Sequence, residues 1–381
     1  MAHRQRQASN LGLFILMIKS ILELTGKDLS GKKVLLRVDF NVLVKNEKIL
    51  EIYRIKENKE TINYLTNNGA ILGLVSHITA IESFEPILSQ IKEILGINFN
   101  FINDCIGESV ETNLNSAKSG DTFLLENARK YEGEEKNDVN FAKNLAGPFD
   151  LYINNAFSAS HRNHASLVAI TEFLPSYAGF LLIKEIEKLS SALNMPKGGK
   201  TLILGGAKIE TKFPIIKNFL DKAENILIGG AIANVFLKAK DMDIKKSLTD
   251  DNLLPEAKKL LEESNNIIIP EDYIISDNMI LDIGPEATNK FINVINASRI
   301  VIWNGPLGKV EEEKFSIGSK KIAEAIINSG AFSVVGGGDT VAFLEKLILV
   351  DKFNYVSTGG GAMLEFLSGN KLPGLVVLGY E

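Results

Sequence analysis

The order of the predicted elements along the chain limits the fold more than any single residue does. Short apolar runs alternate with helical patterns from Lys32 to the end of the chain. Strands and helices that alternate in this way form parallel sheets covered by helices on both faces. We therefore predict an α/β protein, whose ligands bind where the strands reach their carboxyl ends. The helical patterns lie at 55–67, 84–95, 213–223, 314–328 and 341–349, and the apolar runs include KKVLLRVDF, AILGLVSH, DLYINNAF, KTLILGG and FSVVGGG.

A long helical pattern closed by Pro196, Gly198 and Gly199 divides the chain near its middle. Arginine and histidine motifs precede it and glycine clusters follow it, so the two halves are expected to hold different ligands. At 381 residues the chain is also long for a single hydrophobic core. The sequence predicts two domains, at 17–175 and 200–358, joined by a helix at 176–199.

Composition and the N-terminus narrow the class of protein. The formal net charge of −5 argues against a general binder of nucleic acid or of membrane surfaces. Cys105 is the one cysteine, which excludes a disulfide within the chain and suits a reducing compartment. The apolar run at 11–18 is too short to span a bilayer, and no cleavage motif follows it. We expect a cytoplasmic protein in which 1–16 is a disordered extension or a start-site artefact.

Four glycine clusters carry the strongest chemical signal. Each one follows an apolar run and precedes a helical pattern, where backbone N–H groups and a helix N-terminus favour an anion such as phosphate. The chain lacks both the G-x-x-x-x-G-K-[ST] and the G-x-G-x-x-G motif. Asp339 follows the third cluster and could be a helix N-cap or a ligand of Mg²⁺. The clusters are Gly205–Gly206, Gly229–Gly230, Gly336–Gly338 and Gly359–Gly361.

Polar residues near these clusters extend the pattern. Lys208 and Lys212 are four residues apart at an expected helix start, on one face and one turn, where an anion would compensate their charge. They could equally be a solvated pair. Asn304 and Glu311 are expected on a Pro-Gly loop and suit the hydroxyls of a sugar, although the acidic run that contains Glu311 could be a charged first helical turn.

The first half carries residues that suit a second anion. Arg54, Arg129 and Arg162 stand at or near predicted strand ends, and arginine binds phosphate in bidentate geometry. His77 also follows a strand, and Asp39 and Asn41 alternate with apolar neighbours. The alternative is that these side chains belong to structural hydrogen-bond networks.

In order, and across nearly the whole chain from Met17, the motifs resemble those of the phosphoglycerate kinase family. The resemblance implies two Rossmann-like domains, with 3-phosphoglycerate on the first, Mg-nucleotide on the second, and the connecting helix as a hinge. It also implies that 359–381 returns to the first domain and that a monomer acts on small molecules, with no nucleic-acid or membrane partner. The motifs include LLRVDFNV, LLENARKYEGEEKND, YINNAFSASHRNHAS, LGGAKIETKF, VIWNGPLGKVEEEKF, VVGGGDTVAFLEK and VSTGGGAMLEFLSGNKLPG.

The resemblance also implies site residues, position by position. The triose-phosphate contacts would be Asp39, Asn41, Arg54, His77, Arg129 and Arg162. The nucleotide contacts would be Gly206, Ala207, Lys212, Asn304, Pro306, Glu311, Gly336, Gly337, Gly338, Asp339 and Thr340, with Asp339 also at the Mg²⁺ ion. The transferring phosphoryl group would meet Arg54, Lys208, Gly338 and Gly360. Its transfer between 1,3-bisphosphoglycerate and ADP would rest on positioning and charge neutralisation.

Several motifs depart from the family pattern. The usual Leu-Gly-Arg-Pro after Ser-His is absent from SHITAIESFEP, so one arginine is missing, and the usual Asp-Ala-Phe-Gly appears as NAFS. These departures leave open a nucleotide-binding scaffold without turnover. Two Rossmann-like halves would also suit a nicotinamide-dependent dehydrogenase, but the missing dinucleotide motif argues against it.

Overall fold

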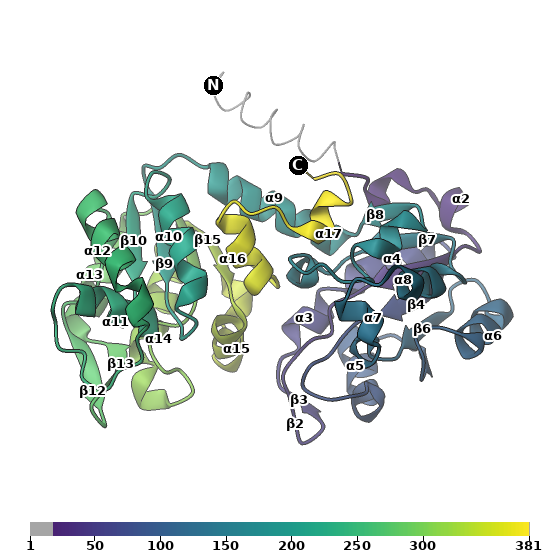
Figure 1. Ribbon diagram of the computed structural model, residues 1–381, viewed down its shortest axis with the longest axis horizontal. Coiled ribbons are helices and arrows are strands. Elements are labelled where there is room, and N and C mark those ends of the chain that lie inside the picture. Colours follow the sequence, from purple (N-terminus) through teal and green to yellow (C-terminus); the bar gives the residue numbers. More distant parts are fainter. Residues whose placement is uncertain (1–17, 381) are drawn as a thin grey trace. The chain divides into compact units, whose positions relative to one another are not determined.

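The computed structural model describes residues 18–380 and divides them into two compact units (Figure 1). The first unit comprises the residues up to 187 together with those from 371 onward, and the second comprises 188–370. The expected extension at 1–16 lies outside the described residues. The segment 359–370 belongs to the second unit, whereas the returning segment was expected to begin at 359.

The described part of the first unit contains a parallel sheet of six strands in the order β5-β6-β4-β1-β7-β8. Its central strands are apolar on both faces because helices cover both. In β1, Val34 and Leu36 pack in one core cluster with Leu65, while Leu35 packs in another with Leu114. The strands are β1 (Lys33–Arg37), β4 (Ile71–Val75), β5 (Asn100–Ile102), β6 (Thr122–Leu125), β7 (Leu151–Asn154) and β8 (Ser176–Ala178), beside the short hairpin β2 (Val44–Lys45) and β3 (Lys48–Ile49).

Local signals set the limits of several helices in this unit. The Asp138 side chain accepts a hydrogen bond from Phe141 N and so caps the start of α8. Gly96, with φ of 64°, ends α5 in the left-handed conformation. The helices are α2 (Gly26–Leu29), α3 (Tyr53–Lys56), α4 (Lys59–Asn67), α5 (Leu88–Leu95), α6 (Glu108–Ser116), α7 (Glu132–Glu135), α8 (Val139–Ala146) and α17 (Pro373–Val376), with 3₁₀ turns at Ile21–Glu23, Glu85–Ile87, Ala128–Lys130, Phe157–Ala159 and Ala169–Glu172.

The second unit repeats the architecture within its described residues. Its six parallel strands run in the order β11-β10-β9-β14-β15-β16. The strands are β9 (Lys200–Leu204), β10 (Asn225–Ile228), β11 (Ile267–Ile268), β14 (Ile300–Asn304), β15 (Phe332–Gly336) and β16 (Tyr355–Val356), beside the antiparallel hairpin β12 (Tyr273–Ser276) and β13 (Met279–Ile283). The helices are α10 (Phe213–Phe219), α11 (Gly230–Ala239), α12 (Leu254–Glu263), α13 (Pro285–Asn296), α14 (Ile317–Asn328), α15 (Gly338–Lys346) and α16 (Gly361–Leu367), with 3₁₀ turns at Glu210–Lys212, Asp251–Leu253, Glu313–Phe315 and Val350–Lys352.

The helix expected at 176–199 is shorter than predicted. Residues Ser176–Ala178 form β8, because their backbone pairs with Tyr152–Asn154 of β7. The helix α9 then runs over Phe180–Asn194. The predicted helix at 55–67 is also divided, into α3 and α4. Across residues 18–380, no helix is both long and apolar enough to cross a membrane.

Candidate functional site

The carboxyl ends of β1, β4 and β7 bring together polar residues that are far apart in sequence. Asp39 follows β1 and is buried, and its Oδ2 lies 3.2 Å from the Nε of Arg54. Ser158, beyond β7, donates to the same oxygen. Arg54 also donates through Nη1 to the backbone carbonyl of Asn41. Asp39 therefore neutralises and orients Arg54, which remains partly exposed.

Asn41 has a fixed amide orientation. Its Oδ1 accepts hydrogen bonds from Thr79 N at 3.0 Å and from Thr79 Oγ1 at 2.9 Å. Both donors hold the oxygen, so the Nδ2 group points away from Thr79 and is available as a donor on the other side of the amide. Thr79 lies in the loop that lacks the arginine of the family motif.

His77 follows β4, and its ring is 3% exposed. Its Nδ1 lies 2.8 Å from Arg37 Nη2. Burial, followed by the charges of Arg37 and Arg162, holds the pKa of His77 well below its ordinary value, so the ring is neutral. Its buried Nε2 has no hydrogen-bond partner among the described residues.

Arg37 is a site residue that the sequence analysis missed. It is the last residue of β1 and is completely buried. A charged side chain directly after the apolar run at 34–36 could have revealed it, because arginine is almost never fully buried without partners. Those partners include Val38 O at 2.6 Å and Ser166 Oγ at 2.9 Å.

Arginine supplies the positive charge of this group. Arg162 lies close enough to Asp39 and Arg37 for both charges to act on its pKa, which burial lowers. Burial and Arg162 also lower the pKa of His164 to about 4, so this ring is neutral near pH 7. Arg129 is placed differently, since its Nε pairs with Glu135 Oε1 at 3.1 Å rather than with the residues above. The structure therefore joins Asp39, Asn41, Arg54, His77 and Arg162, whereas Arg129 pairs elsewhere.

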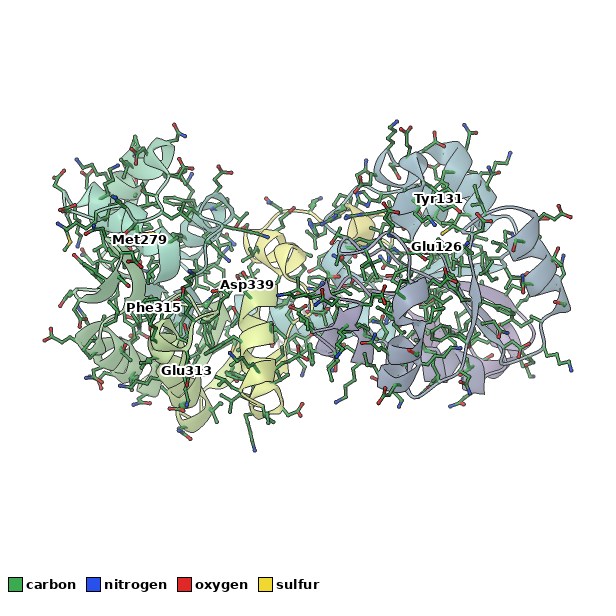
Figure 2. The ribbon with its side chains drawn as sticks, turned by 90° about the horizontal axis from the view of Figure 1, so that it is seen from below. Glu126, Tyr131, Met279, Glu313, Phe315 and Asp339 are labelled. Carbon is green, nitrogen blue, oxygen red and sulfur yellow. The ribbon has the colours of Figure 1, made fainter. Side chains whose placement is uncertain are left out.

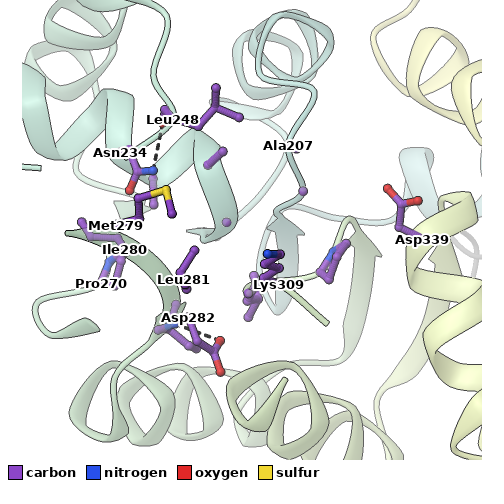
Figure 3. Close-up of a pocket in the computed structure, with 18 of the residues that line it drawn as sticks. Ala207, Asn234, Leu248, Pro270, Met279, Ile280, Leu281, Asp282, Lys309 and Asp339 are labelled. Carbon is purple, nitrogen blue, oxygen red and sulfur yellow. Dashed lines mark hydrogen bonds between the residues drawn. The ribbon is translucent and has the colours of Figure 1, made fainter. Parts of the chain in front are cut away.

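The second unit contains a pocket of about 330 Å³ (Figure 3). Figure 3 shows Leu248, Met279 and Leu281 at one end and Asp339 at the other, beyond Ala207. The apolar end could not be predicted from the sequence, because apolar residue types carry no distinctive chemical signal. Five predicted nucleotide contacts line the pocket, namely Gly206, Ala207, Pro306, Glu311 and Asp339.

The first glycine clusters of this unit serve close packing, which corrects the expectation that their N–H groups face an anion. Gly206 N donates to Pro306 O at 2.7 Å, and Gly230 N donates to Leu307 O at 2.9 Å. A Cβ on Gly305, whose φ is +91°, would meet Gly205 O at 2.2 Å. These glycines let two backbone segments touch and form the pocket wall.

The third glycine cluster keeps its helix N-terminus open. Gly337, with φ of 99°, is the N-cap of α15, and no side chain of the described chain caps this helix. The first N–H groups of a helix lack partners within it, so they can face an anion. Asp339 is in the first turn rather than at the N-cap, so the capping alternative is wrong (Figure 2). Thr340 is buried, and its Oγ1 accepts a hydrogen bond from Gly305 N at 2.9 Å.

Lys208 and Lys212 do not share a helical face, contrary to expectation. Lys208 is exposed and precedes the 3₁₀ turn Glu210–Lys212, whereas Lys212 is 5% exposed. Lys212 Nζ donates to the side-chain oxygen of Asn304, which is buried at the end of β14 rather than on a loop. Burial lowers the pKa of Lys212 to about 7, although Asp339 acts in the opposite direction.

The last cluster opens a short helix. Gly360, with φ of 47°, is the N-cap of α16, and Gly359 N donates to Ser357 Oγ at 3.0 Å. Gly336 is the last residue of β15. A Cβ atom at this position would lie 2.2 Å from Met363 Sδ, so a larger residue would require the Met363 side chain to move. Gly338 is the first residue of α15, where a Cβ would have open space.

The pocket of the second unit offers the carboxylate of Asp339 as a ligand for a divalent cation. Asp339 lies at the pocket end next to the helix N-terminus (Figure 3). Within residues 18–380 no group of three His, Cys, Asp or Glu side chains is placed to hold a metal. One carboxylate with phosphate oxygens and water suits Mg²⁺, which rarely uses an all-protein cage.

Known proteins resemble this chain over nearly its whole length. The sequence profile described as "Phosphoglycerate kinase" matches residues 24–370. A protein named phosphoglycerate kinase from Dictyoglomus turgidum is 42% identical, with 94% of this chain and 98% of that protein covered. One from Thermosipho africanus is 41% identical, with 91% and 95% covered. The crystal structure of phosphoglycerate kinase from Pyrococcus horikoshii OT3 has a TM-score of 0.87 at 31% identity and covers 95% of this chain and 98% of that one.

Proposed function

The chain belongs to the phosphoglycerate kinase family, and we infer from this that it catalyses the reversible transfer of a phosphoryl group from 1,3-bisphosphoglycerate to ADP. It is a phosphotransferase that has a carboxyl group as acceptor in the reverse direction. The family match over residues 24–370 favours this enzyme over the nucleotide-binding scaffold. The same family match favours a kinase over the nicotinamide-dependent dehydrogenase that two Rossmann-like halves would also suit.

The observation that carries the proposal is the polarity of the pocket in the second unit. Its apolar end, with Leu248, Met279 and Leu281, suits a purine base. Its other end, with Asp339 beside the open N-terminus of α15, suits phosphates and their metal. We propose the nucleotide contacts Gly206, Ala207, Lys212, Asn304, Pro306, Glu311, Gly336, Gly337, Gly338, Asp339 and Thr340.

The first unit supplies a complementary site for phosphoglycerate. The guanidinium groups of Arg54 and Arg162 act electrostatically on His77, which is neutral, and the Asn41 amide is held in one orientation. Arg129 is proposed as a further contact if it exchanges Glu135 for the substrate, because its Nη2 has no hydrogen-bond partner among the described residues. The substrate contacts proposed here are Asp39, Asn41, Arg54, His77, Arg129 and Arg162.

Catalysis needs no general base in this proposal. The attacking carboxylate or phosphate oxygen is already ionised at neutral pH, so the protein must position the reactants and neutralise charge. Arg54 and Lys208 would neutralise the transferring group, and the N–H groups at Gly338 and Gly360 would orient it. Asp339 would hold Mg²⁺, which, when bound, offsets the negative charge of the nucleotide phosphates.

The remaining parts of the proposal concern organisation. We propose that the two units bind different substrates, that α9 acts as the hinge, and that a monomer in the cytoplasm performs the reaction. The single buried cysteine suits that reducing compartment. Light scattering of the purified chain measures the oligomeric state directly.

A coupled assay for ATP formation tests the function. The wild type should form ATP from 1,3-bisphosphoglycerate and Mg-ADP, and Asp339→Asn should lose most of this activity. Asp351→Asn, which changes an exposed carboxylate of the same unit, is the matched control and should not. Binding of Mg-ADP without ATP formation by the wild type would support the scaffold instead.

A further inference from the structure

A chain of buried hydrogen bonds leads from α7 to the ring of His77. Glu134 accepts from Ser166 Oγ at 2.6 Å through Oε1 and from Ser166 N at 2.9 Å through Oε2. Ser166 Oγ in turn accepts from Arg37 Nε at 2.9 Å. Arg37 Nη2 lies 2.8 Å from His77 Nδ1. Glu134, Ser166 and Arg37 are completely buried, so water does not compete for their hydrogen bonds.

The direction of the last hydrogen bond is forced by chemistry. A guanidinium group has five N–H donors and no acceptor, so His77 Nδ1 must be the acceptor and cannot carry a proton. A neutral imidazole carries one proton, which must then be on Nε2. That N–H group is buried without a hydrogen-bond partner among residues 18–380, and an unpaired buried donor is energetically unfavourable.

The surroundings of His77 indicate what would satisfy this donor. The groups that act electrostatically on the ring are Arg37, Arg162, His164 and Arg54, and each of them disfavours its protonation. Asp39, the nearby carboxylate, is already engaged by Arg54 and Ser158. A neutral N–H donor among arginines attracts an anion, such as a phosphate or carboxylate group.

We propose that Arg37 is a positioning residue which, held by Ser166 and neutralised by Glu134, fixes His77 as the Nε2–H tautomer and so presents a hydrogen-bond donor to the anionic groups of phosphoglycerate. The substrate in this proposal rests on the proposed function, whereas the tautomer does not. Without the buried carboxylate, the Arg37 guanidinium would be an uncompensated charge beneath an anion site. Glu134 therefore stabilises Arg37 where its donors are needed.

His77 can be observed directly, since the chain has only four histidines. Long-range ¹H–¹⁵N spectra distinguish an N–H nitrogen from a bare one, and a His77→Gln variant assigns the signal. The ligand-free wild type should show one Nε2–H tautomer. Addition of 3-phosphoglycerate should shift the Nε2 signal more than that of Nδ1.

Two variants test the role of Arg37. The double variant R37M/E134Q removes both buried charges together, which avoids leaving one uncompensated. Its His77 should become a mixture of tautomers, and its KM for 3-phosphoglycerate should rise about tenfold with kcat nearly unchanged. S166A should show a smaller change in the same direction, and S166T, which keeps the hydroxyl, should restore the wild-type behaviour.

S160A is the matched control for S166A. Ser160 is also completely buried, but its Oγ donates to Ala156 O and makes no hydrogen bond to Arg37, so S160A should leave the His77 tautomer unchanged. A wild-type ring that carries its proton on Nδ1 overturns the proposal. So does a folded R37M/E134Q variant that keeps a pure Nε2–H tautomer and an unchanged KM. If the wild type forms no ATP, the proposed function fails, and the ligand-free spectra still decide whether Arg37 fixes the ring.

Discussion

The Nζ atom of Lys212 donates a hydrogen bond to the side-chain oxygen of Asn304, and both residues are buried. The amide oxygen carries no charge, and burial lowers the pKa of Lys212 to about 7, although the Asp339 carboxylate acts in the opposite direction. A nucleotide phosphate placed beside it would supply the missing negative charge. The protonation state of Lys212 should therefore depend on the ligand.

Nucleotide binding should take up a proton at Lys212. At pH 8 the free protein holds this side chain largely neutral, and a bound phosphate raises its pKa, so up to about one proton should be taken up. Because the bound state then holds more protons, affinity should fall as pH rises above 7, by at most about tenfold per pH unit. Calorimetry in two buffers of different ionisation enthalpy measures the uptake. Lys212→Met should abolish it, and a buffer-independent enthalpy for the wild type would contradict the assignment.

Asp339→Asn separates the metal role from a structural one. Asp339 is in the first turn of α15 but is not its N-cap, so the change removes a favourable interaction with the helix dipole, about 0.3–1 kcal/mol, and the charge that acts on Lys212. The melting temperature should hardly change, whereas activity at limiting Mg²⁺ should fall steeply. Titration of Mg²⁺ at fixed ADP, with thermal unfolding alongside, tests both. A destabilised protein with normal specific activity would make the metal assignment wrong.

Arg54→Ala should act mainly on kcat. Asp39 orients the guanidinium, and we place it at the transferring phosphoryl group, where a charge-stabilising donor contributes about a hundredfold or more. Steady-state kinetics at fixed ionic strength give kcat and KM separately. Arg54→Lys keeps the charge without the planar fork and should recover part of kcat. If the substitution changes only KM, Arg54 binds the substrate but does not contact the transferring phosphoryl group.

Ala80→Arg should restore a contact that this chain lacks. Ala80 takes the place of the arginine in the family motif after Ser-His and is exposed, in a loop that Asn127 holds through Ile78 N at 3.2 Å and Ile78 O at 2.9 Å. A charge-assisted contact with a distant phosphate is equally strong in the ground and transition states. It should therefore lower KM for phosphoglycerate by about ten- to a hundredfold and leave kcat nearly unchanged.

Ala80→Gln, which has a similar length but no charge, is the control for this prediction. It should leave KM close to the wild-type value. If Ala80→Arg also leaves KM unchanged at low ionic strength, the loop does not face the substrate phosphate.

Local pattern in the sequence was enough to predict the α/β fold, because periodicity and turn residues are properties of neighbouring positions. The motif order also identified the family and marked both predicted sites. The local pattern gave the wrong secondary structure at Ser176–Ala178. There, backbone pairing with β7 overrides the helical pattern.

Only the tertiary structure decided which side chains meet. The strand order places β1 between β4 and β7, which brings Arg37 to His77 and Ser158 to Asp39. It also showed that Gly205 and Gly305 let two backbones touch, and that Lys212 is buried while Lys208 is exposed. These contacts join residues tens of positions apart, and their energies depend on packing and burial that no local pattern encodes. For that physical reason the sequence determined the fold class and family, and the folded chain decided the hydrogen bonds and charges of the sites.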